Sequence, residues 1–102
     1  MQKFRYTITT LIHPKHYSIM SRWTEENDQL SASYTFRDFT EAFAFMTEVA
    51  FHAAKMNHHP NWSNVWNTVD IHLNTHDAGN IVTEKDLVLA RVIDKIYSKF
   101  DN

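Results

Sequence analysis

The sequence lacks cysteine and is nearly without glycine and proline. It contains no cysteine, one glycine and two prolines in 102 residues. The missing cysteine excludes disulfide bonds, thiolate metal sites and a cysteine nucleophile. The single glycine, Gly79, excludes a glycine-rich phosphate-binding loop, and no GxSxG element for a serine nucleophile is present. Because so few turn-forming residues leave no flexible linker, we expect residues 1–102 to form one domain.

The chain also lacks a strong net charge and a long apolar run. Its 10 basic and 12 acidic residues give a formal net charge of −2. Basic residues recur regularly only at Arg91, Lys95 and Lys99, which a helix places on one solvated face, so we predict no direct nucleic-acid contact. The first residues show no signal-peptide pattern, and no run has the length of a membrane span. We therefore expect a cytoplasmic protein without a membrane partner.

Hydrophobic residues are nevertheless abundant enough for a core, at 43% of the chain. Residues 30–37 alternate apolar and polar side chains, which is typical of a half-buried strand. Residues 39–56 then change to the helical period, after Asp38 as cap and Glu41 as the second residue of a capping box. The predicted buried stripe consists of Phe39, Ala42, Phe43, Met46, Val49, Ala50 and Ala53.

Two phenylalanines, Phe45 and Phe51, lie outside that stripe. Exposed apolar residues occur on any surface, but two phenylalanines on one helix suggest a second contact, such as another subunit. Asn57 can end this helix, and Pro60 prevents its continuation.

Residues 65–76 alternate again, with Val65, Val69, Ile71 and Leu73 on one side. Twelve residues are long for one strand, so we predict a bend or bulge near Asn67. A turn follows at residues 77–80.

A second helix is predicted over residues 83–100, with Thr83 as its cap and Asp86 closing a capping box. Residues 4–9 could form a short strand and residues 15–20 a short helix. This order predicts an α+β fold, in which an antiparallel sheet of about four strands carries two long helices on one face, with the short N-terminal helix as a further element.

Adjacent histidines in the stretch NHHP, residues 57–60, raise the question of function. His58 and His59 follow a helix end in a loop constrained by Pro60, and His76 ends a predicted strand. Binding and catalytic groups concentrate at such positions, and imidazole can give and take a proton near neutral pH. Solvated loop histidines, a metal site and metal-free acid–base chemistry all fit this pattern.

A metal site would need three converging ligands, which His58, His59 and His76 with Asp77 could supply. Adjacent histidines are not a known ligand spacing, however, so we expect no bound metal. Trp62 and Trp66 could form flat apolar walls for a planar ligand or could pack in the core.

The segment 57–86, NHHPNWSNVWNTVDIHLNTHDAGNIVTEKD, combines these histidines with an aromatic residue and a closing aspartate. The ordered set is His58-His59-Pro60, Trp66, His76 and Asp86. It resembles the pterin-4a-carbinolamine dehydratase family, and with the preceding helix and Trp23 the resemblance covers roughly residues 23–97.

The resemblance implies a set of site residues. The active-site histidines would be His58, His59 and His76. Pterin contacts would also come from Asn57, Asn74, Thr75 and Asp77. Supporting roles are expected for Pro60, Trp23, Trp62, Trp66, Lys85 and Asp86. One departure is Ala54, four residues before the histidine pair, where the family usually has an acidic or polar residue.

The implied reaction is the dehydration of a 4a-hydroxytetrahydropterin to quinonoid dihydropterin and water, in which the pterin is the substrate and no cofactor is needed. His58 and His76 would share the acid and base roles, in either order, while His59 positions the substrate. A homodimer or homotetramer is expected, and an aromatic amino acid hydroxylase could be a partner. The alternative is a non-enzymatic role, in which a helix face binds a partner such as a transcription factor.

Overall fold

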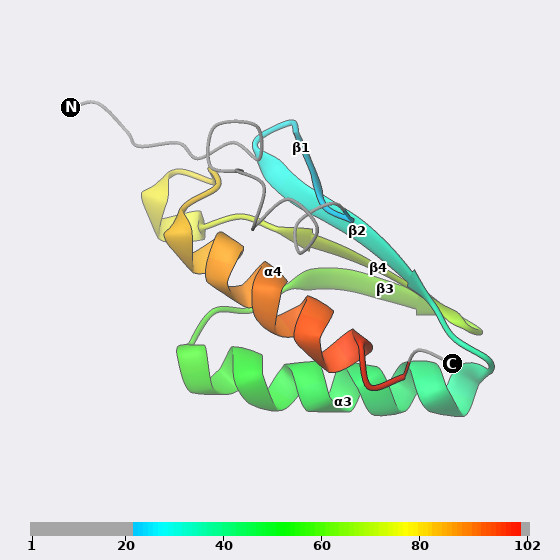
Figure 1. Ribbon diagram of the computed structural model, residues 1–102. Coiled ribbons are helices and arrows are strands. Elements are labelled where there is room, and N and C mark those ends of the chain that lie inside the picture. The colour runs from blue at the N-terminus through cyan, green and yellow to red at the C-terminus, as the bar shows by residue number, and fades with distance from the viewer. Residues whose placement is uncertain (1–21, 101–102) are drawn as a thin grey trace.

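The computed structural model describes residues 22–100, which form a four-stranded sheet with two helices on one face (Figure 1). All neighbouring strands are antiparallel, in the order β1-β2-β4-β3. The elements are β1 (Thr24–Glu26), β2 (Gln29–Thr35), α3 (Phe39–Met56), β3 (Asn61–Val65), β4 (Thr68–Leu73), the 3-10 helix η1 (His76–Ala78) and α4 (Glu84–Tyr97). The predicted α+β class and its sheet-and-helix arrangement are confirmed. The strand expected at 4–9 and the helix expected at 15–20 lie outside the described residues.

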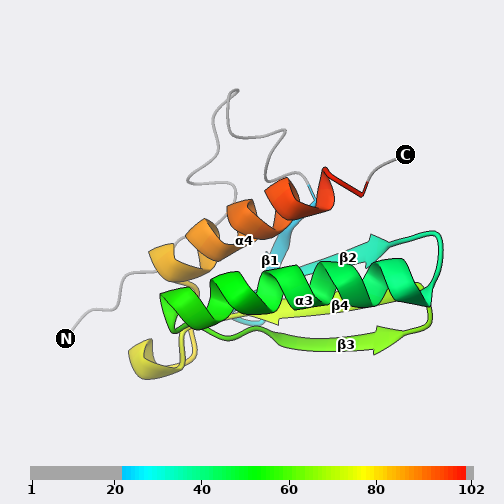
Figure 2. The ribbon, with the colours of Figure 1, turned by 90° about the horizontal axis from the view of Figure 1, so that it is seen from below.

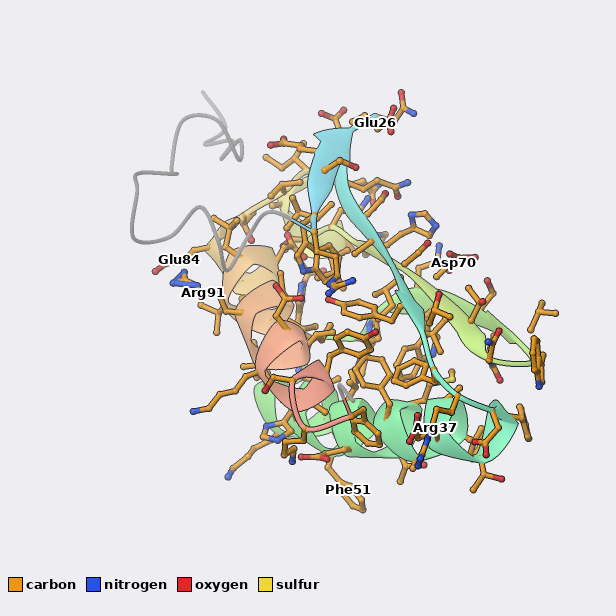
Figure 3. All side chains as sticks on the ribbon, turned by 45° about the vertical axis from the view of Figure 1, so that its right-hand side comes forward. Glu26, Arg37, Phe51, Asp70, Glu84 and Arg91 are labelled. Atoms are coloured by element: carbon orange, nitrogen blue, oxygen red, sulfur yellow. The ribbon has the colours of Figure 1, made fainter. Side chains whose placement is uncertain are left out.

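The core lies between the sheet and the helices, which cover the same sheet face in both views (Figures 1 and 2). Alternation along β2 and β4 produces this division. The inward side chains are Leu30, Ala32, Tyr34, Val69, Ile71 and Leu73, all buried. Their neighbours, such as Ser33 and Asp70, occupy the opposite face, where Figure 3 shows Asp70 pointing away from the helices. The period-2 pattern thus determined which sheet face the helices cover.

Helix α3 begins as predicted but is packed through a different face. The Asp38 side chain accepts a hydrogen bond from the Glu41 backbone N–H at 2.8 Å. The Glu41 carboxylate accepts from the Arg37 backbone N–H at 3.1 Å, so it does not return to Asp38 as a capping box requires.

The set of residues predicted to be buried on α3 is wrong for three phenylalanines. Phe45 is fully buried and its ring lies 5.1 Å from that of Tyr34 and 4.8 Å from that of Phe36. Phe39 and Phe43, expected inside, are about half exposed at 50% and 55%. Apolar residues surround most of this helix, so the helical period alone could not select the face that meets the sheet. The buried residues are Ala42, Phe45, Val49 and Ala53.

The segment expected as one long strand is a hairpin. Strands β3 and β4 pair antiparallel across a two-residue turn, Trp66–Asn67, in which Trp66 has a φ of 49°. The bend predicted near Asn67 is therefore a full reversal of the chain, and Val65 is exposed rather than buried. The side-chain amide of Asn67 also connects the turn to the residue that follows β2, since Asn67 Nδ2 donates to the carbonyl oxygen of Phe36 at 2.9 Å.

Strand β1 was not predicted, because it is short and polar. It joins β2 through Asn27 and Asp28, both with positive φ (55° and 61°). Positive φ at both central positions is the geometry of a tight hairpin turn that Asn and Asp tolerate. Trp23, just before β1, is buried in the core.

Helix α4 has the predicted capping box, in which the Asp86 side chain accepts from the Thr83 backbone N–H at 2.9 Å. Its inward residues Leu89, Ile93 and Ile96 are buried. Within residues 22–100, neither helix has the length and apolar character needed to cross a membrane.

A part-buried hydrogen bond joins α4 to β2. The Tyr34 hydroxyl donates to Asp94 Oδ1 at 2.5 Å, and the Arg22 guanidinium lies over the Tyr34 and Tyr97 rings at 4.8 and 4.7 Å. Burial raises the pKa of the Asp94 carboxyl above its ordinary value of 3.8, against the lowering effects of Tyr34, Trp23 and Arg22. Burial and the neighbouring Asp94 likewise raise the pKa of the Tyr34 hydroxyl, which stays protonated as a donor.

Candidate active site

The end of α3, the η1 turn after β4 and the start of α4 lie together at one end of the molecule (Figures 1 and 2). A polar pocket of about 350 Å³ is lined by residues of these segments. Its lining residues are Asn57, His58, His59, Asn74, Thr75, His76, Asp77 and Lys85. The three histidines and all four further residues expected to contact a ligand therefore meet in one place. Its volume is at the lower end of the range for small-molecule sites.

The end of α3 gives the two adjacent histidines a fixed direction. Asn57 has φ 52° and ψ 44°, in the left-handed region that asparagine tolerates better than most residues. The backbone N–H of His58 donates to the Ala53 carbonyl oxygen at 3.0 Å, and that of Asn57 to Ala54 at 3.1 Å. This hydrogen-bond pattern is the Schellman motif, which closes the helix and turns the chain sharply. The predicted helix end at Asn57 is confirmed.

His58 and His59 point into different environments although they are neighbours. His58 is only 8% exposed, and its Nε2 lies 2.6 Å from Asp86 Oδ1. His59 is exposed at the pocket. The interpretation as solvated loop histidines is therefore wrong for His58, whose ring is held by a buried carboxylate.

Asp86 is fully buried and connects three parts of the chain. Its Oδ1 contacts His58 at the end of α3, while its Oδ2 accepts from the Thr75 hydroxyl at 2.8 Å and from the Thr83 N–H at 2.9 Å. Buried carboxylates need such partners to offset the loss of water. The residue that completes the capping box of α4 is thus also the residue that orients His58.

His76 opens η1 and is exposed at the pocket. Its Nδ1 lies 3.2 Å from Asn80 Oδ1, and Asn80 has a positive φ of 60° after Gly79 at 91°. The turn is closed by Thr75, whose N–H donates to the Ile81 carbonyl oxygen at 2.8 Å. Sequence reasoning did not identify Asn80 as a partner of His76; an Asn directly after the only glycine was the available signal.

Neither Trp62 nor Trp66 lines the pocket, so their interpretation as flat walls for a planar ligand is wrong, and the alternative of core packing holds for Trp62. Trp66 is 64% exposed in the β3–β4 turn, at the end of the hairpin opposite to the pocket (Figure 2). The six residues of β4 separate that turn from the histidines by roughly 20 Å. Trp62 is half-buried against the core cluster, and Trp23 is buried within it.

The pocket carries charge of both signs at its rim, since Asp77 and Lys85 both line it. Across residues 22–100, no three histidine, aspartate or glutamate side chains are placed to hold one metal ion. The site therefore presents imidazoles, two asparagine amides and a charged pair. These groups suit hydrogen bonding and proton transfer to a small polar ligand.

The fold and pocket bring three histidines together at one polar pocket on an α+β scaffold. The model of the family described as pterin 4 alpha carbinolamine dehydratase matches residues 7–96. The chain belongs to this family, which confirms the resemblance seen in the sequence.

Bacterial relatives agree with that assignment. One from Rhizorhabdus wittichii is 51% identical over 74 residues, covering 72% of this chain and 75% of the relative. One from a Bradyrhizobium strain is 54% identical over 79 residues, covering 76% and 79%. Both carry pterin-4-alpha-carbinolamine dehydratase as a provisional name.

Solved structures share the fold. A Brucella melitensis protein described as a transcriptional coactivator/pterin dehydratase is 35% identical, with a TM-score of 0.77, covering 91% of this chain and 98% of its own. A pterin dehydratase-like protein, identified as a RuBisCO assembly factor in the alpha-carboxysome, is 21% identical with a TM-score of 0.60, covering 74% and 86%. The second likeness shows the fold alone.

Proposed function

We propose that the protein dehydrates a 4a-hydroxytetrahydropterin to quinonoid dihydropterin and water, with histidines as acid and base. The observation that carries this proposal is the buried His58–Asp86 pair at 2.6 Å, beside two further histidines in one pocket. The family supplies the substrate class, and the pocket supplies groups suited to the proton transfers that this reaction requires.

His58 is the base in this proposal. Its Nε2 is engaged by Asp86, which leaves Nδ1 to take the proton from the pterin ring nitrogen. The positive charge that forms on the ring is then stabilised by a carboxylate at hydrogen-bond distance in a buried setting. The same arrangement keeps the imidazole in one orientation before the substrate arrives.

His76 is the acid in this proposal. It is exposed at the pocket, and its Nδ1 donates to Asn80 Oδ1, so the ring acts as an acid in its doubly protonated form, in which Nε2 carries the proton for the 4a-hydroxyl. Transfer of its proton to that hydroxyl turns the leaving group into water, while the ring nitrogen loses its proton to His58. One proton is given and one is taken, so no redox partner or other reactant is needed.

His59 and the polar rim position the substrate. The pyrimidine half of a pterin carries several hydrogen-bond donors and acceptors, which the amides of Asn57 and Asn74 and the charges of Asp77 and Lys85 can match. In the cell this reaction would recycle the pterin cofactor of aromatic amino acid hydroxylases, in the cytoplasm.

A dehydratase assay tests the proposal. The 4a-hydroxytetrahydropterin is generated in situ and its absorbance decay followed with wild type, His58→Ala and His76→Ala. Each variant should be slower by about 10²–10⁴-fold, the contribution of one general acid or base. His52→Ala, an exposed histidine of α3 outside this pocket, is the matched control and should retain full activity. Failure of the folded wild type to exceed the spontaneous rate would refute the proposal.

The exposed face of α3 supports a second candidate function, which is binding to another protein chain. Phe51 is 74% exposed and points away from the domain (Figure 3), and Phe39 and Phe43 are half exposed. Phe45, which the sequence suggested for this contact, belongs to the core instead. Between the phenylalanines the exposed residues of this face are uncharged, namely Thr40, Ala44, Thr47, Ala50 and Ala54.

Such an uncovered apolar face is typical of a protein interface. A homodimer or homotetramer would bury it, and a regulatory protein could use it instead. Light scattering of wild type and of Phe43→Glu distinguishes these cases. A fall in oligomer size in the variant supports a contact between copies, whereas an unchanged monomer in both leaves the face to a different protein. Active enzyme in every state would exclude a purely non-enzymatic role.

A further inference from the structure

Two threonines meet behind the catalytic histidine. Thr75, after β4, and Thr83, the cap of α4, have their Oγ1 atoms 2.6 Å apart, and both contact Asp86. We propose that Thr75 and Thr83 are positioning residues, which hold the Asp86 carboxylate so that it fixes the proton of His58 on Nε2. The catalytic consequence rests on the proposed function, whereas the location of the proton does not.

The available hydrogens determine the arrangement. Asp86 Oδ2 accepts from the Thr83 N–H and from the Thr75 hydroxyl, whose only hydrogen is thereby used. The Thr83 hydroxyl must then donate to Thr75 Oγ1. Both donors reach Oδ2, so Oδ1 is left to face His58 Nε2 at 2.6 Å. Because a carboxylate can only accept, Nε2 carries the hydrogen and Nδ1 keeps its lone pair in the neutral ring.

Burial makes this arrangement specific. Asp86 is 0% exposed and Thr75 is 6% exposed, so water cannot readily replace a lost threonine hydroxyl. Rotation of the carboxylate would break two hydrogen bonds at Oδ2 at once, and this resists exchange of the two oxygens. The pterin-contacting role expected for Thr75 therefore differs from what its hydroxyl does, since that group faces Asp86.

Nitrogen-15 NMR of the His58 ring tests the location of the proton without any substrate. The wild-type spectrum at pH 8 should show a protonated Nε2 and an unprotonated Nδ1. Thr75→Val removes the hydroxyl and keeps the shape, so the carboxylate is held by one donor fewer and can turn away from Nε2 in part of the molecules. The spectrum should then show a mixture of both tautomers. Thr83→Val should change the tautomer ratio of His58 less, because the Thr83 backbone N–H still donates to Asp86 Oδ2. Thr75→Ser and Thr83→Ser keep the hydroxyl and should restore the wild-type spectrum.

Kinetics test the catalytic consequence in the same variants. Thr75→Val should lower kcat by about tenfold, the scale of one hydrogen bond to a charged group, with KM nearly unchanged. Thr75→Ser should recover most of that loss. If the His58 tautomer is the same in folded Thr75→Val as in wild type, or if an active wild type and folded Thr75→Val have the same kcat, the inference is overturned. If Thr75→Val does not fold, Thr83→Val and its serine counterpart decide by the same readouts.

The inference and the proposed function can fail separately. An inactive wild type in which Thr75→Val still shifts the His58 tautomer would refute the proposed reaction and keep the positioning role on the ring. An active wild type in which neither Thr75→Val nor Thr83→Val changes the His58 tautomer would support the reaction and refute the positioning role.

Discussion

Replacing Asp86 by asparagine is the sharpest single test of how the site is assembled. The exchange keeps the size of the side chain and turns one acceptor oxygen into an NH2 donor. Thr75 and Thr83 both present donors to one side of residue 86, so the amide oxygen will face them. The NH2 group then faces His58 Nε2, and two donors meet unless the ring moves its hydrogen to Nδ1. His58 would then have no lone pair towards the substrate.

The magnitude follows from these contacts. Loss of the base and of the charge that stabilises it should lower kcat by about 10²–10⁴-fold. Stability should change less. Two hydrogen bonds to a charged acceptor, at about 1.5–3 kcal/mol each, become neutral bonds at about 0.5–1.5 kcal/mol. Relief from burying a charge offsets part of that loss, so we expect a net loss of about 1–2 kcal/mol. For a chain of this length, each kcal/mol lowers Tm by about 4–8 °C.

The measurement combines the dehydratase assay with thermal unfolding of the same sample. Asp70→Asn, a change of a carboxylate on the sheet face opposite to the helices and outside the pocket, is the matched control and should leave kcat at the wild-type level. A folded Asp86→Asn protein with wild-type kcat would refute the role of the His58–Asp86 pair. A large loss of kcat together with an unchanged Tm would show that Asp86 orients the His58 imidazole but does not stabilise α4.

Three further predictions follow from the fold. Phe45→Ala should cost about 3–5 kcal/mol in urea unfolding, whereas Phe43→Ala should change stability by less than about 0.5 kcal/mol; equal effects would contradict the observed packing. Because the pKa of Asp94 is raised on folding, Asp94 contributes to folding stability below pH 3.8, and this contribution is lost as pH rises through the raised pKa. The urea midpoint of wild type should therefore fall with rising pH in that range, and Asp94→Asn should reduce the fall; an equal fall in the variant would contradict the prediction. Trp66→Ala should leave kcat and KM within about twofold of wild type, because the Trp66 side chain is exposed in a turn away from the pocket. A tenfold change, which corresponds to about 1.4 kcal/mol in the activation barrier, would show that the turn belongs to the site.

Regular patterns with strong local causes could be predicted from the sequence. The alternation of β2 and β4 permits only one side of each strand to be buried, and the capping box of α4 is a contact between residues three apart. The face of α3 could not be predicted in the same way, because apolar residues lie on both sides of that helix. Tertiary packing chose Phe45 and left Phe43 outside.

The turns were harder because their residues are unusual. The β3–β4 hairpin reverses at Trp66–Asn67, with no glycine or proline to mark it. For the site, the resemblance to a family identified the histidines and Asp86. The hydrogen bonds that Asp86 forms with His58 and Thr75 join residues 28 and 11 positions apart in the chain, and only the structure could show them.

Asp86 contacts both His58 in the pocket and the first turn of α4, so ligand binding in the pocket and opening of that turn are linked. A ligand that immobilises His58 also holds the carboxylate on the first turn of α4, so its binding should slow hydrogen exchange at the Thr83 amide. By the same linkage, each opening of that turn frees the imidazole to change its tautomer. Under the proposed mechanism, the fraction of time for which α4 is closed at its first turn would therefore set the fraction of molecules that are ready to react.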